Sequence, residues 1–148
     1  MKLNKALNST TSWTVSSILL VAVLTVVVWS LDKGMIFSDE AYFVFRTMPG
    51  IEKLGDSYWN IIYSPFILDN YVHTKYLLIF LTISTAYLMG YSAAAYLKFS
   101  ISPGLIGIWC VITQFAFFSP TGITPNHSSI NLLIFNLVIA SLSFYLLY

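Results

Sequence analysis

The stretch Trp13–Leu31 reads WTVSSILLVAVLTVVVWSL and decides the fold class, because its 19 residues carry no charge. A helix of about 20 mostly apolar residues, rising about 1.5 Å per residue, crosses the hydrocarbon core of a bilayer. The many valines are compatible with a helix there, since the backbone finds no competing partner in lipid. Trp13 and Trp29 lie near the two ends, as aromatic side chains do at membrane interfaces. The stretch therefore predicts a transmembrane helix.

A secretory signal peptide is the alternative for this region, since Lys2 and Lys5 precede the apolar run. The uncharged run covers 6–31, which is longer than the apolar core of about 7–15 residues in a signal peptide. No small-x-small cleavage site follows it. We therefore interpret the stretch as an uncleaved membrane helix.

The composition of the whole chain agrees with this class. Of its 148 residues, 57% are hydrophobic and only 9% are charged, whereas soluble domains carry about 25% charged residues. The formal net charge of +1 gives no reason to expect a nucleic-acid partner. Cys110 is the single cysteine, so an intrachain disulfide and a zinc-type Cys/His pattern are both excluded.

Three further uncharged stretches predict an all-α polytopic protein with four transmembrane helices in a single domain spanning 1–148. In the second helix Ala86, Gly90 and Ala94 recur every four residues, a spacing that lets another helix approach closely. Ser102 is placed to cap the third helix, with Pro103 at its first position. The helices are expected at about 13–31, 76–97, 103–118 and 127–148, with short connections at 98–102 and 119–126.

The segment 32–75 is a polar loop of 44 residues that holds all six acidic residues of the chain. It is also rich in aromatic residues, which a disordered linker lacks. We therefore expect short amphipathic helices at the membrane surface, over about 39–48 and 56–63. Four spans put both termini on one side, and the short Lys98-containing link favours that side as cytoplasmic. The loop is then external, at the plasma or inner membrane.

Asp39 and Glu40 follow the first helix almost directly and are the candidate catalytic residues. A carboxylate at a water–lipid boundary can deprotonate a hydroxyl or hold a divalent cation, which is the one candidate cofactor. The alternative is structural: both acids favour the positive end of a short surface helix that Ser38 caps.

The motif Ser38-Asp-Glu-Ala-Tyr-Phe43, placed directly after a first membrane helix, resembles the start of the GT-C glycosyltransferases. The resemblance is closest to the branch of protein mannosyltransferases and aminoarabinose transferases of lipid A, similar to glycosyltransferase family 39. Thr124-Pro-Asn-His-Ser-Ser129 is more loosely similar to an Asn-x-Asn-Ser/Thr element of that branch. Family members are cell-envelope enzymes with more helices and usually a soluble C-terminal domain, so this chain is expected to be the N-terminal part of such an enzyme.

The resemblance implies transfer of a sugar from a polyprenyl-phosphate donor to an acceptor hydroxyl, with inversion. Asp39 is then the general base and Glu40 assists it. Candidate groups for the substrate and its phosphate are Arg46, Lys53, Lys75, Asn126 and His127. Cations that only meet lipid headgroups, and interhelical hydrogen bonds at the start of the fourth helix, are the alternative interpretations.

Two polar residues inside the later helices, Gln114 and Asn136, are expected to form hydrogen bonds between helices, because polar groups in lipid face other helices. The rival function is a non-enzymatic four-helix accessory or assembly subunit of a larger membrane complex. The expected partners are membrane lipid and the lipid-linked sugar, with further transmembrane helices or a partner subunit as the open addition.

Overall fold

The computed structural model describes residues 2–30, 71–122 and 127–147, and all of the secondary structure in these ranges is helical. The four helices are α1 (Lys2–Ser30), α4 (Tyr71–Tyr96), α5 (Pro103–Gly122) and α6 (His127–Leu147). The prediction of an all-α chain is confirmed for these residues. The surface helices expected at 39–48 and 56–63 lie outside them.

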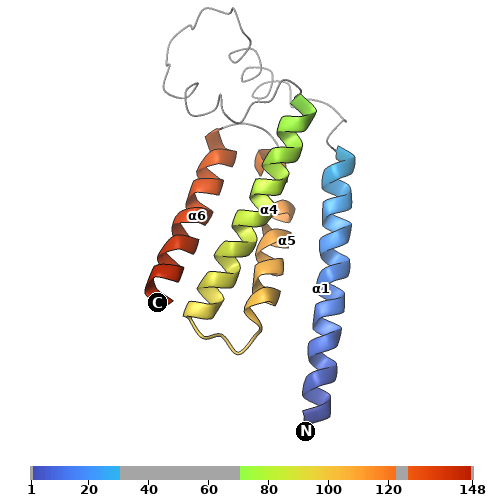
Figure 1. The fold of residues 1–148 in the computed structure, drawn as a ribbon. Coiled ribbons are helices and arrows are strands. Elements are labelled where there is room, and N and C mark those ends of the chain that lie inside the picture. Colours follow the sequence, from blue (N-terminus) through green and yellow to red (C-terminus); the bar gives the residue numbers. More distant parts are fainter. Residues whose placement is uncertain (1, 31–70, 123–126, 148) are drawn as a thin grey trace, which may run out of the picture.

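The helices form an up-and-down bundle with α4 at its centre (Figure 1). α4 packs against both α5 and α6, while α1 packs mainly against α5. Successive helices run in opposite directions, so the start of α1, the end of α6 and the 97–102 link lie at one end. We call this end the link end. The core between α1, α4 and α5 contains buried Val27, Ile79, Ala86, Val111 and Phe115.

Two of the four helices are long and apolar enough to cross a membrane, over Thr10–Trp29 and Lys75–Tyr96. The apolar parts of the other two are shorter, Pro103–Ala116 and Asn131–Leu147. The first span is only 11% buried inside the bundle and the second is 44% buried. α4 is therefore the central helix, and α1 is attached along one side.

Three helix boundaries differ from those expected from hydropathy. α1 begins at Lys2 rather than Trp13, because the polar residues before the apolar stretch also adopt helix. α4 begins at Tyr71 rather than Tyr76, so Lys75 is a helical residue and not part of the loop. α5 continues to Gly122 through the expected turn at 119–122.

The small-residue repeat on α4 does allow a close helix approach, and the neighbour is α5. Ala86 and Ala94 are 0% and 1% exposed, and Gly90 is buried between them. A Cβ atom built on Gly90 would lie 2.6 Å from the Cys110 Sγ and 3.0 Å from the Gly107 Cα. These distances leave no room for a side chain, so Gly90 sets the separation of α4 and α5.

The link between α4 and α5 is a tight turn with a left-handed residue at its start. Lys98 has φ 52°, and its N–H donates to the Ala95 carbonyl while the Phe99 N–H donates to the Ala94 carbonyl. This is the Schellman pattern that closes helix C-termini, usually with glycine at the left-handed position. The Ser102 carbonyl then accepts from the N–H groups of Leu105 and Ile106. This places Ser102 at the expected cap, with Pro103 first in α5.

Candidate functional site

Five of the residues that the sequence singled out lie outside the part of the chain that the structure describes. These are Asp39, Glu40, Arg46, Lys53 and Asn126. His127 is the first residue of α6. The structure does describe the helix ends to which these segments are attached.

Those helix ends all lie at the end of the bundle opposite the link end (Figure 1). The segment that carries Asp39 and Glu40 leaves α1 after Ser30 and enters α4 at Tyr71. The segment that carries Asn126 leaves α5 after Gly122 and enters α6 at His127. Both segments are therefore attached to one end of the bundle, which we call the loop end.

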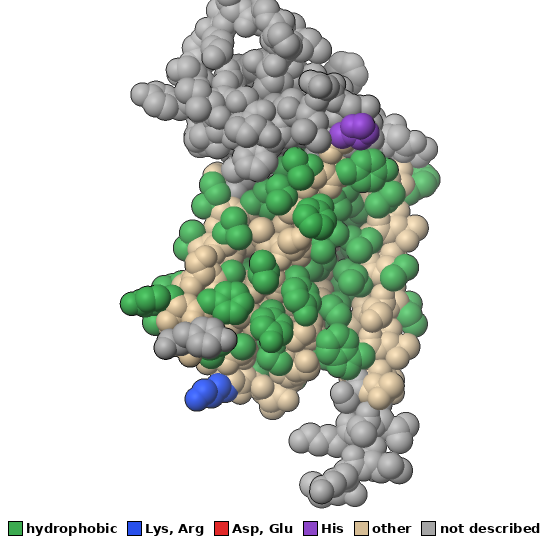
Figure 2. Space-filling view, in the orientation of Figure 1, with side chains coloured by type: hydrophobic (Ala, Val, Ile, Leu, Met, Phe, Trp, Pro, Cys, Tyr) green, Lys and Arg blue, Asp and Glu red, His purple; other side chains and the backbone are tan. Residues whose placement is uncertain are grey.

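Two basic residues of α4 lie in its first two turns, at the loop end. His73 is exposed, whereas Lys75 is only 4% exposed. A histidine side chain is visible at the boundary between the bundle and the grey segment (Figure 2). Lysine is almost never this buried unless its charge is balanced. Of the predicted phosphate-binding cations, Lys75 is the one that the structure describes, and it lies below the surface.

A second polar group lies deeper, where three helices meet. The Gln114 Nε2 donates to the Asn136 Oδ1 at 2.8 Å, and the Asn136 Nδ2 donates back to the Gln114 Oε1 at 3.1 Å. The Asn136 Nδ2 also donates to the Thr85 Oγ1 at 3.3 Å. Asn136 is 0% exposed, and the other two are 7% and 5% exposed. We call these three residues the polar triad; it connects α4, α5 and α6.

The interhelical bonds predicted for Gln114 and for Asn136 are confirmed, and the structure adds Thr85 as a third member. Its hydroxyl donates to the Leu81 carbonyl of its own helix at 2.8 Å while it accepts from Asn136. Thr113 makes the same kind of intrahelical bond to the Trp109 carbonyl and is exposed. Threonine hydroxyls in helices commonly bond to a carbonyl of the preceding turn. The sequence therefore does not distinguish Thr85, which also bonds to another helix, from Thr113, which does not.

The chemistry of the polar triad is that of neutral amides and a hydroxyl. None of the three residues is a strong base or a metal ligand of the usual kind, and their hydrogen-bonding groups are directed at one another. Among the described residues, no group of three His, Cys, Asp or Glu side chains could hold a metal ion. We therefore assign the triad to helix association rather than to catalysis.

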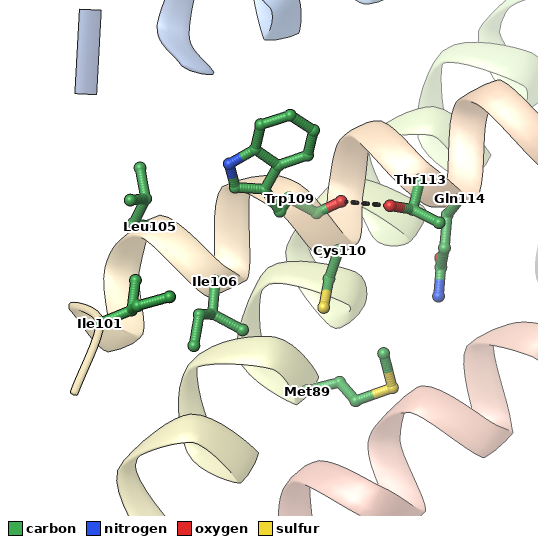
Figure 3. A pocket seen from close by; sticks show the side chains of 8 residues that line it. All are labelled: Met89, Ile101, Leu105, Ile106, Trp109, Cys110, Thr113 and Gln114. Carbon is green, nitrogen blue, oxygen red and sulfur yellow. Dashed lines mark hydrogen bonds between the residues drawn. The ribbon is translucent and has the colours of Figure 1, made fainter. Parts of the chain in front are cut away.

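A groove of about 490 Å³ runs along α4 and α5 beside the triad. Its lining is mainly apolar and includes the polar side chains of Gln114 and Thr113 (Figure 3). In this view Met89 of α4 lies below Cys110 of α5, and its side chain extends toward the side of Gln114. A second hollow of about 480 Å³ lies between α1 and α5 and includes the hydroxyl residues Thr11, Ser12 and Ser16. Neither contains an acidic side chain.

No protein-family model, curated protein or solved structure matches the chain.

Proposed function

We propose that the chain is a polytopic membrane protein in which all four helices cross the bilayer. The aromatic residues of the two longest apolar helices support this. Trp13 and Trp29 on α1, and Tyr76 and Tyr96 on α4, are all at least 36% exposed. At about 1.5 Å per residue the pairs are separated by about 24 and 30 Å. The hydrocarbon core is about 30 Å thick, so both pairs fit its two interfaces.

The distribution of polar and apolar side chains supports the same proposal. Large apolar residues cover the outside of the bundle, as Figure 2 shows for one face. Fully polar side chains lie inside, with Asn136 and Ser92 at 0% exposure and Thr82 at 2%. In water, exposed large apolar side chains and buried polar side chains both cost free energy. In lipid, apolar side chains are expected on the outside and polar groups are expected to face other helices.

Within this frame, the proposed function is that of a GT-C-like glycosyltransferase that uses a polyprenyl-phosphate-linked sugar. The observation that carries the proposal is the common attachment of two segments at the loop end. One contains the Asp39-Glu40 motif and the other contains Asn126. The segments that carry the two parts of the sequence resemblance are thus attached at the same end of the bundle. We propose that this end lies at the membrane boundary where a lipid-linked sugar presents its phosphate.

In the proposed reaction the Asp39 carboxylate takes the proton of the acceptor hydroxyl. The acceptor oxygen forms a bond to the anomeric carbon while the bond from that carbon to the donor phosphate oxygen breaks, with inversion. The electron pair leaves with the polyprenyl phosphate. A cation near the phosphate stabilises this developing charge. Lys75 is the candidate for this role on a described helix, with Arg46 and Lys53 as candidates in the segment before it.

The test is Asp39→Asn in the protein expressed from its own gene in its native host. We expect the lipid-linked sugar to accumulate and the glycosylated product to disappear, measured by mass spectrometry of membrane lipids and envelope glycans. Asp56→Asn is the matched control, because it makes the same change in the same segment. Full transfer by Asp39→Asn at normal membrane levels would overturn the catalytic assignment.

One observation favours the non-enzymatic alternative, an accessory subunit of a membrane complex. The membrane span of α1 is only 11% buried, so most of its apolar surface is left uncovered by the other helices. A partner helix on that surface would survive mild detergent extraction. This alternative predicts full function with Asp39 and Glu40 both neutralised, which the glycosyltransferase proposal forbids.

A further inference from the structure

The tip of the α4–α5 hairpin, residues 97–102, combines exposed apolar side chains with a single charge. Every residue from Leu97 to Ser102 is exposed. Leu97, Phe99 and Ile101 are 57%, 53% and 54% exposed, and they alternate with Lys98, Ser100 and Ser102. Turns that lie in water are usually built from small and polar residues. This tip is therefore suited to a boundary between water and an apolar phase.

Several backbone groups of the tip form hydrogen bonds within the hairpin, which suits a position with little water. The N–H groups of Leu97, Lys98 and Phe99 are all bonded to carbonyls of the last turn of α4. The Ser102 carbonyl is bonded twice by the first turn of α5. These four backbone groups of the tip are paired internally, so they lose little when water is withdrawn.

Lys98 is the only Asp, Glu, Lys or Arg residue between Tyr76 and the last residue of the sequence. No acidic side chain that could neutralise it occurs in the sequence of α4, α5 or α6. Figure 2 shows hydrophobic side chains reaching the link end of the bundle, with a Lys or Arg side chain just beyond them. A lysine at the end of an apolar surface extends its ammonium group to the headgroup layer.

From this combination we infer that the hairpin tip is inserted at the headgroup boundary of the membrane, where Lys98 binds the phosphate of an anionic lipid. Leu97, Phe99 and Ile101 contact the outer acyl segments, and the serines lie among the headgroups. The inference rests on the membrane-spanning part of the proposed function and is independent of the glycosyltransferase part. It assigns a lipid-binding role to the end of the bundle opposite the proposed reaction.

The test uses the full chain in vesicles of phosphatidylcholine and phosphatidylglycerol, in a Cys110→Ala background. An environment-sensitive NBD group on Phe99→Cys reports insertion, and nitroxide-labelled lipids of either headgroup type act as quenchers. We expect blue-shifted emission and shallow quenching. One lysine near an anionic surface is worth about 1 kcal/mol, so the anionic lipid should be enriched about fivefold at the probe. Lys98→Gln should abolish this preference, and Lys98→Arg should retain it.

Lys33→Gln is the matched control, since it removes the same charge from the segment attached at the opposite end of the bundle and should leave the preference at the probe unchanged. Water-like emission without quenching would overturn the insertion of the tip. Equal quenching by both lipids with Lys98 present would overturn the anionic-lipid site. Extraction of the whole chain by alkaline carbonate would instead refute the membrane-spanning premise. Failure of the Asp39→Asn test leaves all of these readouts unaffected.

Discussion

Gln114 of α5 and Asn136 of α6 exchange two hydrogen bonds through their side-chain amides, at 2.8 and 3.1 Å. α5 and α6 otherwise touch little, because both pack mainly on α4. The amide pair is thus a principal direct connection between them. The additional bond from Asn136 to Thr85 fixes the pair against α4. The relative rotation of three helices is therefore set at one buried point.

The first prediction concerns Asn136→Leu. It leaves the Gln114 amide and the Thr85 acceptor without their partner in a buried position, which costs about 1–3 kcal/mol. Measured pairs in membrane proteins average about 0.6 kcal/mol, so the lower part of that range is expected. The free energy of unfolding in mixed SDS and nonionic micelles, followed by far-UV circular dichroism, measures the loss.

The double variant Gln114→Leu with Asn136→Leu separates pairing from simple packing. Since replacing both partners leaves no orphaned amide, its destabilisation should be smaller than the sum of the two single effects. Thr113→Val is the control, because Thr113 is exposed and bonds only within its helix; it should be neutral. Strict additivity would show that the two amides do not act as a pair.

The polar triad also illustrates what can be predicted from this sequence. Uncharged stretches of helical length predict the four helices, and the isolation of Gln114 and Asn136 in apolar surroundings predicts that each bonds to another helix. That the two residues bond to each other is known only from the structure. The start of α4 could not be predicted from hydropathy, because Tyr71–Lys75 is as polar as the preceding loop. These residues are nevertheless helical in the structure. The sequence therefore predicts that Lys75 belongs to the loop, whereas the structure has it buried on α4. The candidate carboxylates at 39 and 40 lie outside the described residues, so their proposed role stays a prediction.

The second prediction concerns Gly90→Ala. The new Cβ would meet the Cys110 Sγ at 2.6 Å and the Gly107 backbone at 3.0 Å, so α4 and α5 must separate. Overpacking of this kind costs about 1–3 kcal/mol, against a gain in helix propensity of about 1 kcal/mol. A net decrease in the free energy of unfolding is expected in the same micelle assay.

Gly104→Ala is the matched control for that experiment. Its Cβ would meet only the outer atoms of two side chains, the Trp13 Cη2 at 3.0 Å and the Tyr87 Oη at 3.3 Å. These atoms can move by a few tenths of an ångström, so the variant should be close to neutral. If Gly90→Ala were as stable as Gly104→Ala, the close α4–α5 approach at Gly90 would be refuted.

The third prediction concerns the left-handed residue at the end of α4. For a non-glycine residue, the left-handed conformation costs about 1–2 kcal/mol relative to the preferred regions of φ and ψ. Lys98→Gly should therefore stabilise the chain by about 1 kcal/mol in nonionic detergent, where no anionic lipid is present. Lys98→Ala removes the same charge but keeps the Cβ, so it should give no gain. Equal stability of the two variants would contradict the strain at Lys98 (φ 52°).

The fourth prediction concerns membrane sidedness, which follows from the proposed four spans. The segment 31–70 is attached at the loop end of the bundle and the 97–102 tip lies at the link end, so a bilayer crossed by α4 must separate them. In a Cys110→Ala background, Ser57→Cys should react with a membrane-impermeant maleimide in intact cells. Ser100→Cys should react only after the membrane is permeabilised. The unsubstituted Cys110→Ala chain is the control for background labelling. Reaction of both cysteines in intact cells, with an intact cytoplasmic marker, would show that α4 does not cross the membrane.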